Sequence, residues 1–253
     1  MIVSVGASPK EATISFRASR AAFAVLLALA GLALDPPVPA WAEKPVQVPA
    51  FPLSQAGGGN AEDEASPSGA ASRVADWIAA SRDNGTLPYM IVDKKAASLL
   101  LFAPNGKLVA HVPVLIGIAV GDDATPGVGS KKLAEIGPAE KTTPAGRFLA
   151  KYGLAAGSQK VLWVDYAASV ALHPIPKDVS KKERRRQRML SPTADDHRIT
   201  FGCINVPMAF YRDSVLPLLR KKGGYVYVLP DTKPLETVFP LLLSQTVASG
   251  GSH

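Results

Sequence analysis

Cys203 is the only cysteine of this 253-residue chain, and it lies in the segment 200–206, TFGCINV. A thiol has a pKa of about 8.5 and needs a base nearby to supply thiolate at neutral pH. His173, which ends an apolar segment 30 residues upstream, is a candidate for that base. Gly202 permits a tight turn whose N–H groups can face a developing oxyanion. These residues predict covalent acyl transfer, whereas a lone cysteine is otherwise often a small buried side chain.

His197, six residues before Cys203, is the competing base, because geometry rather than separation in the sequence decides which histidine acts. His111 lies in the middle of an expected strand and favours a structural role. One cysteine excludes an internal disulfide framework and a cysteine-rich zinc site. Covalent acyl transfer through a thiol needs neither a metal nor an organic cofactor, so we expect neither.

The net charge and the glycine-containing segments bear on which partners and ligands this protein could bind. The chain carries 28 Lys and Arg against 21 Asp and Glu, a net charge of +7, which suits an anionic partner. The segment 127–132, GVGSKK, superficially resembles a phosphate loop, but its spacing is wrong and no helical pattern follows. We expect neither a nucleotide site nor a nucleic-acid partner.

The elements that position these residues are mainly short strands. The 22 Pro, 21 Gly and 7% aromatic residues favour a β-rich, turn-rich chain. One helix is expected over 207–219 and a shorter one over 73–82. The fold class predicted is mainly β, a sandwich or barrel-like sheet with one or two packed helices. Strands are expected at 89–93, 98–103, 107–114, 147–152, 161–166, 169–173 and 225–229.

The first 42 residues have the order of a signal peptide. Basic residues precede the apolar run 21–34, which is too short to span a bilayer, and Ala40-Trp41-Ala42 resembles a cleavage site. A buried core helix is the alternative. We expect export to the periplasm or cell envelope, with no membrane span after cleavage. A flexible linker and short helix follow at 43–86, and a C-terminal tail is expected at 233–253.

Several segments, taken in order, resemble the YkuD-type L,D-transpeptidases, exported enzymes that cross-link bacterial peptidoglycan. Residues 200–205 match the family's [S/T]-H-G-C-hydrophobic-[N/R] signature except at one position, and 171–173 match its upstream histidine strand. Residues 142–148 look like its T-P-x-G-x-F segment, and 112–114 with Gly117 like the strand and glycine before it. The resemblance spans about 87–230 and places a catalytic domain at 87–232.

This resemblance implies that Cys203 is the nucleophile and His173 the base. In the family a backbone carbonyl orients the histidine, and the carbonyl of Pro174 is in the position to do so. Gly202 would contribute to the oxyanion site. The substrates would be peptidoglycan stem peptides, joined through a thioester to the diaminopimelate amine of a neighbouring stem. With water as acceptor, the same site would be an L,D-carboxypeptidase. A further alternative is a non-catalytic basic envelope protein that binds cell-wall polymer; protein partners are not identified.

Two departures from the family stand out. Phe201 replaces its usual second histidine, and an insert at 177–198, with eight basic and four acidic residues, separates the base from the nucleophile. The insert resembles a Gram-negative branch associated with L-alanine, rather than diaminopimelate, as acyl donor. Since arginine binds carboxylates through two parallel hydrogen bonds, the insert is expected to hold stem peptides, with a solvated helix face as the alternative. The substrate-binding candidates are Arg184, Arg185, Arg186, Arg188, Arg198 and Asn205.

Overall fold

The computed structural model describes residues 67–155 and 159–243, all within the unit 50–253. The predicted signal peptide, 1–42, and the predicted linker up to residue 66 lie outside the described residues. Within the described ranges, no helix has the length and apolar character needed to cross a membrane.

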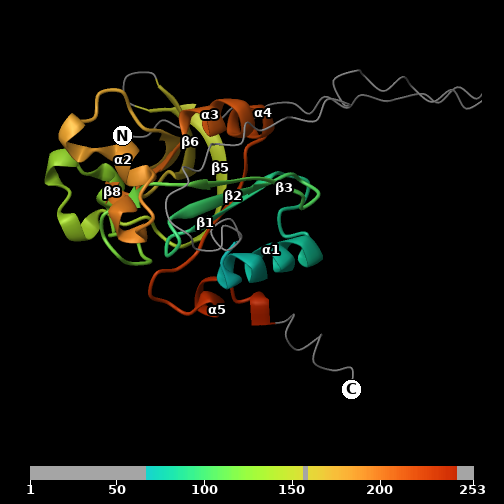
Figure 1. Cartoon of the computed structure of the whole chain (residues 1–253). Helices are drawn as coiled ribbons and strands as arrows, with labels where there is room; N and C mark the ends of the chain where they lie inside the picture. The colour runs from blue at the N-terminus through green and yellow to red at the C-terminus, as the bar shows by residue number, and fades with distance from the viewer. Residues whose placement is uncertain (1–66, 156–158, 244–253) are drawn as a thin grey trace, which may run out of the picture. The chain divides into compact units, whose positions relative to one another are not determined.

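Eight strands form one mixed sheet in the order β3-β2-β1-β10-β5-β6-β7-β9, and β4 pairs with β8 in a separate two-stranded sheet (Figure 1). The predicted mainly β fold is confirmed. The seven longer strands lie where the apolar segments predicted them, within one or two residues at most ends. The strands are β1 (Tyr89–Asp93), β2 (Ser98–Phe102), β3 (Leu108–Pro113), β4 (Ile116–Gly117), β5 (Gly146–Leu154), β6 (Lys160–Asp165), β7 (Val170–Pro174), β8 (Arg198–Thr200), β9 (Ile204–Val206) and β10 (Gly224–Val228).

Strand β5 gives the sheet its sandwich-like character. Its first part, 146–150, pairs with β10, and its second part, 151–154, pairs with β6. Apolar side chains from both halves of the sheet, such as Val92 on β1 and Leu172 on β7, belong to one core cluster. A single strand therefore connects two halves that share their interior.

A second core lies on the other face of β1, β2 and β10, beneath α1 (Gly69–Ser81) and the C-terminal segment. Val74, Trp77 and Ile78 of α1 are buried there, as the expected helix over 73–82 requires, although α1 begins four residues earlier. The tail predicted from residue 233 is wrong in part, because α5 (Leu235–Val238) leads into Phe239 and Leu242, which are both buried. Their apolar surface is removed from water by this packing.

The helix predicted over 207–219 forms as three consecutive segments, α3 (Met208–Phe210), η7 (Tyr211–Val215) and α4 (Leu216–Leu219). The middle segment is a widened π-type turn. Pro217 has no N–H to donate to the carbonyl of Asp213, so the regular pattern of hydrogen bonds is interrupted there. Phe210, Val215 and Leu219 still face the main core.

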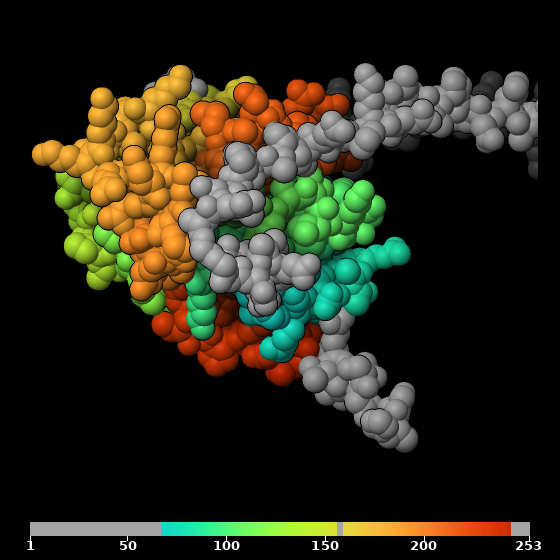
Figure 2. All heavy atoms as spheres, in the orientation of Figure 1, coloured from blue at the N-terminus to red at the C-terminus, as the bar shows by residue number. Residues whose placement is uncertain are grey.

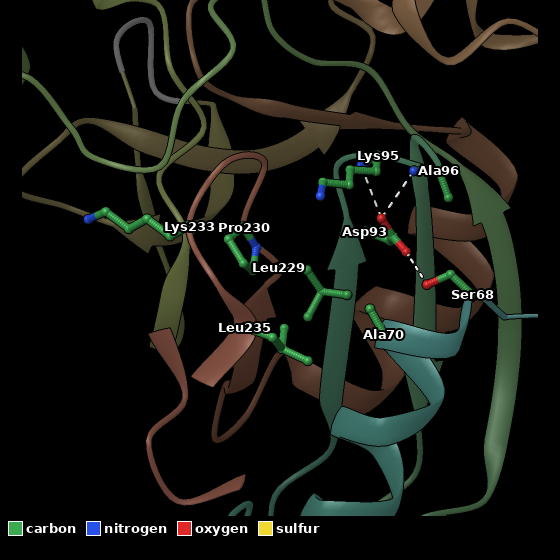
Figure 3. A pocket seen from close by; sticks show the side chains of 9 residues that line it. All are labelled: Ser68, Ala70, Asp93, Lys95, Ala96, Leu229, Pro230, Lys233 and Leu235. Carbon is green, nitrogen blue, oxygen red and sulfur yellow. Dashed lines mark hydrogen bonds between the residues drawn. The ribbon is translucent and has the colours of Figure 1, made fainter. Parts of the chain in front are cut away.

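The start of α1 is joined to the turn between β1 and β2 around a pocket of about 350 Å³ (Figure 3). Asp93 accepts hydrogen bonds from the backbone N–H groups of Lys95 and Ala96, both at 3.0 Å, and from the Ser68 hydroxyl. Ser68 in turn accepts from the N–H of Ala71 and caps the helix. The Asp93 carboxylate and the Ser68 hydroxyl are thus used in folding, and the pocket contains no predicted site residue.

A buried lysine follows directly after β1. The Lys94 ammonium donates to the carbonyl of Thr143 at 3.0 Å and pairs with Asp122 at 3.0 Å and Asp231 at 3.3 Å. All three charged side chains are almost fully buried. Removing one member of such a cluster leaves the others uncompensated, at a cost of about 3–5 kcal/mol. Lys94 therefore ties the segment around Thr143 to the main sheet.

Candidate active site

The residue predicted as base lies on one of two neighbouring parallel strands, and the residue predicted as nucleophile lies directly before the other. β7 carries His173, and β9 begins one residue after Cys203. The register pairs Leu172 with Ile204, both in the main core, and His173 with Asn205. Because successive side chains of a strand point to opposite faces, His173 and Asn205 lie on the outer face, with Cys203 at its edge.

The turn before Cys203 requires glycine. Gly202 has a φ of 122°, and a Cβ atom there would lie 2.6 Å from the carbonyl oxygen of Thr142. The neighbouring Thr143 hydroxyl donates to the carbonyl of Gly202 at 2.8 Å and accepts from the N–H of Gly117 at 2.9 Å. In a trans peptide the C=O and N–H point in opposite directions, so this contact directs the Cys203 N–H away from Thr143.

The N–H of Gly202, predicted as part of an oxyanion site, is used within the turn. It donates to the hydroxyl oxygen of Thr200 at 3.2 Å, and that hydroxyl donates to the carbonyl of Cys203 at 2.6 Å. The Cys203 N–H is therefore the better candidate for an oxyanion donor.

The imidazole of His173 is held in one tautomer. Its Nδ1 lies 2.8 Å from the carbonyl oxygen of Pro174. Since a carbonyl only accepts, Nδ1 carries the proton and Nε2 keeps its lone pair. Burial lowers the pKa of His173; the Pro174 carbonyl opposes this effect and the Arg185 charge adds to it. A neutral imidazole at neutral pH is the form that can accept a proton.

Burial favours the protonated form of the Cys203 thiol. Burial raises its pKa, although an N–H of Ala171 and the positive charge of Arg185 both lower it in part. The sulfur lies 3.7 Å from the carbonyl oxygen of Ser169, to which the thiol donates. Within the described ranges no hydrogen bond joins Cys203 to His173. Catalytic contacts are often long in unliganded enzymes and tighten with substrate bound.

His197 does not have the contacts of a base. It is buried, with Nδ1 at 2.8 Å from the carbonyl oxygen of Val114 and Nε2 at 2.9 Å from that of Ser191. Both ring nitrogens face acceptors, so neither offers a lone pair toward Cys203. His197 instead fastens the insert to the chain before β4. His111 lies in β3 opposite Leu100, away from the predicted site residues.

The insert lies at the surface, in yellow-orange in Figure 2. It contains three short helical segments, η5 (Lys181–Glu183), α2 (Arg185–Met189) and η6 (Ala194–His197). Its arginines do not act as one group. Arg184 and Arg186 are exposed, whereas Arg188 donates to the carbonyls of Glu183 at 3.1 Å and Asp196 at 3.0 Å, which braces the insert. Arg198 forms an ion pair of 2.7 Å with buried Asp231, a structural role that differs from the predicted substrate contact.

Arg185 alone of the insert arginines reaches the residues beside the nucleophile. Its side chain is only 10% exposed, its Nη1 donates to Asn205 Oδ1 at 2.8 Å, and its Nε pairs with Glu183 at 2.5 Å. Asn205 is itself fully buried, and its Nδ2 has no hydrogen-bond partner. The structure thus brings together Arg185, Asn205 and His173, with Cys203 two residues from Asn205.

The sequence alone does not reveal the roles of Thr143 and Ser169. Thr143 stands out only as part of the segment 142–148, and Ser169, at the turn before β7 with a φ of 59°, carries no signal at all. The sequence shows that Thr143 stands directly before Pro144. Its contact with Gly202, 59 residues later, depends on the fold and cannot be predicted from the sequence.

Comparison with known proteins gives matches by structure only. The chain resembles solved L,D-transpeptidases. One, from Enterococcus faecium, has 16% identity and a TM-score of 0.31 over 56% of this chain and 49% of its own. Another, from Xylanimonas cellulosilytica, has 13% identity and a TM-score of 0.34 over 56% and 60%. The helical cell shape determining protein of Campylobacter jejuni has 14% identity and a TM-score of 0.39 over 68% and 61%.

The chain therefore spans between about half and three fifths of the length of these solved chains. No protein-family model matches the sequence, and no curated protein matches it either.

Proposed function

We propose that this protein is an exported cysteine L,D-transpeptidase that forms peptidoglycan cross-links. The observation that carries the proposal is the contact of His173 Nδ1 with the Pro174 carbonyl, on the strand that pairs with the one following Cys203. It supports a tautomer of His173 whose Nε2 can accept a proton, on the strand adjacent to the segment that carries the only thiol of the chain. A buried structural cysteine has no need of such a partner.

In the first half-reaction His173 Nε2 takes the proton of the Cys203 thiol as the sulfur attacks an amide carbonyl of the donor stem peptide. The oxyanion that forms is bound by backbone N–H groups at the turn, among them that of Cys203. The C–N bond then breaks, the leaving amine takes the proton from His173, and the acyl group remains on Cys203 as a thioester.

In the second half-reaction the side-chain amine of diaminopimelate on a neighbouring stem attacks the thioester. His173 accepts a proton from this amine and returns it to the sulfur as the C–S bond breaks. An amide cross-link and the free thiol result, so the enzyme is regenerated without any other reactant. If water attacks instead, the product is a trimmed stem, as an L,D-carboxypeptidase would give.

The donor is either diaminopimelate or, as in the Gram-negative branch that the insert resembles, L-alanine. The signal-peptide pattern of 1–42 supports action in the periplasm or cell envelope. The insert borders the groups that react, because it connects β7 to the turn before β9.

Incubation of the purified mature protein with disaccharide stem peptides, followed by mass spectrometry, tests the proposal. A dimer that fragments to a new amide supports transpeptidation, whereas a shortened monomer alone shows water as the acceptor. Cys203→Ala is the control and should abolish both products, since alanine fits the site but forms no thioester. Absence of product with the native protein, together with a thiol that iodoacetamide does not alkylate in the folded state, would favour the non-catalytic alternative.

A further inference from the structure

We propose that Arg185 is a positioning residue: it supplies a fixed positive charge to the Cys203–His173 pair and favours the thiolate of Cys203. The inference deepens the proposed function and rests on it for the roles of the two residues. The bond that carries it is the one from Arg185 Nη1 to Asn205 Oδ1 at 2.8 Å.

This bond fixes the guanidinium relative to both reacting groups. Asn205 of β9 is paired in register with His173 on β7, and Cys203 lies two residues before it, just ahead of the strand. A charge attached to Asn205 is therefore held at a constant position next to the pair. The Nε of Arg185 also binds the Glu183 carboxylate at 2.5 Å, so Arg185 has little freedom to turn away.

The burial of the contact increases its electrostatic effect. The Arg185 side chain is 10% exposed and Asn205 is fully buried, so water screens the charge less than at the surface. Asn205 Nδ2 lies buried without a hydrogen-bond partner, which is unfavourable. The amide nevertheless presents its oxygen to Arg185, which is the orientation that a nearby cation favours.

The effect on the two reacting groups has a definite sign. A positive charge stabilises the thiolate and disfavours the imidazolium, so Arg185 lowers the pKa of both Cys203 and His173. For Cys203 this opposes the dominant effect of burial. Among the described residues, the Glu183 carboxylate is bound to Arg185, and the Lys141 ammonium lies 3.8 Å from the centre of the ring of Phe201, two residues before Cys203.

The insert thereby contributes a charge to the reaction centre as well as a surface. Arg184, Arg186 and Arg188 cannot do the same, since the first two are exposed and the third is bound to carbonyls within the insert.

The pH dependence of Cys203 alkylation by iodoacetamide, followed by intact-protein mass spectrometry from pH 5 to 10, tests the proposal without peptidoglycan. Arg185→Gln should lower the alkylation rate at pH 7 by about three- to tenfold and shift the profile to higher pH. Arg185→Lys, which keeps the charge, should restore most of the rate. Arg186→Gln, with the same loss of charge one residue away, should leave the profile unchanged.

An unshifted profile in Arg185→Gln overturns the proposal, as does an equal shift in Arg185→Lys, which would indicate a purely structural role. An equal shift in Arg186→Gln also overturns it, because net charge would then be the cause. Melting curves show whether Arg185→Gln folds. If it does not, Arg185→Lys tests the proposal: an alkylation profile like that of the native protein supports it, and a profile shifted to higher pH overturns it. Because no cell-wall substrate is used, these results are separate from success or failure of the transpeptidase assay.

Discussion

The hydroxyl of Thr143 donates a hydrogen bond of 2.8 Å to the carbonyl oxygen of Gly202, the residue before the predicted nucleophile. Both residues are buried, and the Lys94 ammonium binds the carbonyl of Thr143 from the other side. A chain of contacts therefore runs from the main sheet to the peptide that bears the Cys203 N–H. This N–H can serve as an oxyanion donor only while that peptide keeps its orientation.

Thr143→Val should accordingly reduce cross-linking by about 10–100-fold, part of the 10²–10³-fold that a lost oxyanion donor costs. It should also lower the free energy of unfolding by about 1–3 kcal/mol, because the Gly202 carbonyl loses its partner. Thr143→Ser keeps the hydroxyl and is the matched control. Steady-state rates and denaturant unfolding measure the two effects, and a Val variant as active as the Ser variant would refute the role given to this contact.

Gly202→Ala should be destabilising beyond the cost of backbone strain alone. Its φ of 122° is unfavourable for alanine, and the added Cβ would meet the Thr142 carbonyl at 2.6 Å. Gly127 has a φ of 75°, and a Cβ added there would meet nothing within 4 Å, so Gly127→Ala measures strain without the collision. We expect about 1–2 kcal/mol for Gly127→Ala and clearly more for Gly202→Ala in urea unfolding. Equal losses would mean that the close approach to Thr142 is unimportant.

His173→Ala should lose nearly all turnover, since assistance by a general base is worth about 10²–10⁴-fold. His197→Ala should retain most of the chemistry but lower the melting temperature by about 2–8 °C, because the ring loses its contacts with the carbonyls of Val114 and Ser191. Rates and melting curves for both variants separate the two roles. The reverse pattern would identify His197 as the base.

The acid limb of kcat/KM should lie below pH 6.5. Histidine ordinarily has a pKa of about 6.5, and burial lowers the pKa of His173. Because His173 resists protonation in the fold, it stays competent as a base at a pH where a solvated histidine is charged. The contribution of His173 to the stability of the protein is therefore present above the pKa that it has in the unfolded chain. It is lost as the pH falls toward the lower pKa that it has in the folded protein. A pH–rate profile, with circular dichroism at each pH to exclude unfolding, checks the sign; an acid limb above pH 6.5 would contradict it.

A carbapenem should add covalently to Cys203, since the thiolate can open the strained β-lactam as it would attack a stem-peptide carbonyl. Intact-protein mass spectrometry should show one added drug mass in the native protein and none in Cys203→Ala. An unmodified native protein after long incubation would count heavily against the proposed function.

The longer strands could be predicted because their apolar runs are bounded by turns. Both faces of β1 and β2 are covered, which explains runs such as Ser98–Phe102 without polar alternation. The two- and three-residue strands β4, β8 and β9 contain too few residues for a periodic signal. Only pairing partners distant in the sequence stabilise them, and these partners are set by the tertiary structure.

In the candidate site, too, some features could be predicted from the sequence and others depend on the tertiary structure. The contact of His173 with the Pro174 carbonyl is one that the family resemblance led us to expect, and it is present in the structure. The distinction between Arg185 and its neighbours could not be predicted, because the run from Arg184 to Arg188 has no apolar face from which to read orientation. It depends on Asn205 being brought next to α2 by the pairing of β7 with β9.

That pairing has a consequence for the order in which the protein folds. β7 and β9 are adjacent and parallel, so no tight turn can join them, and the chain passes through the whole insert and through β8 in another sheet before it returns. The entropy of closing so long a loop is lost before the strand contacts compensate for it, whereas β1 with β2 and β5 with β6 close locally. We therefore expect the hairpins to form early and the crossover last. Catalytic competence would then be the final property that the folding chain acquires.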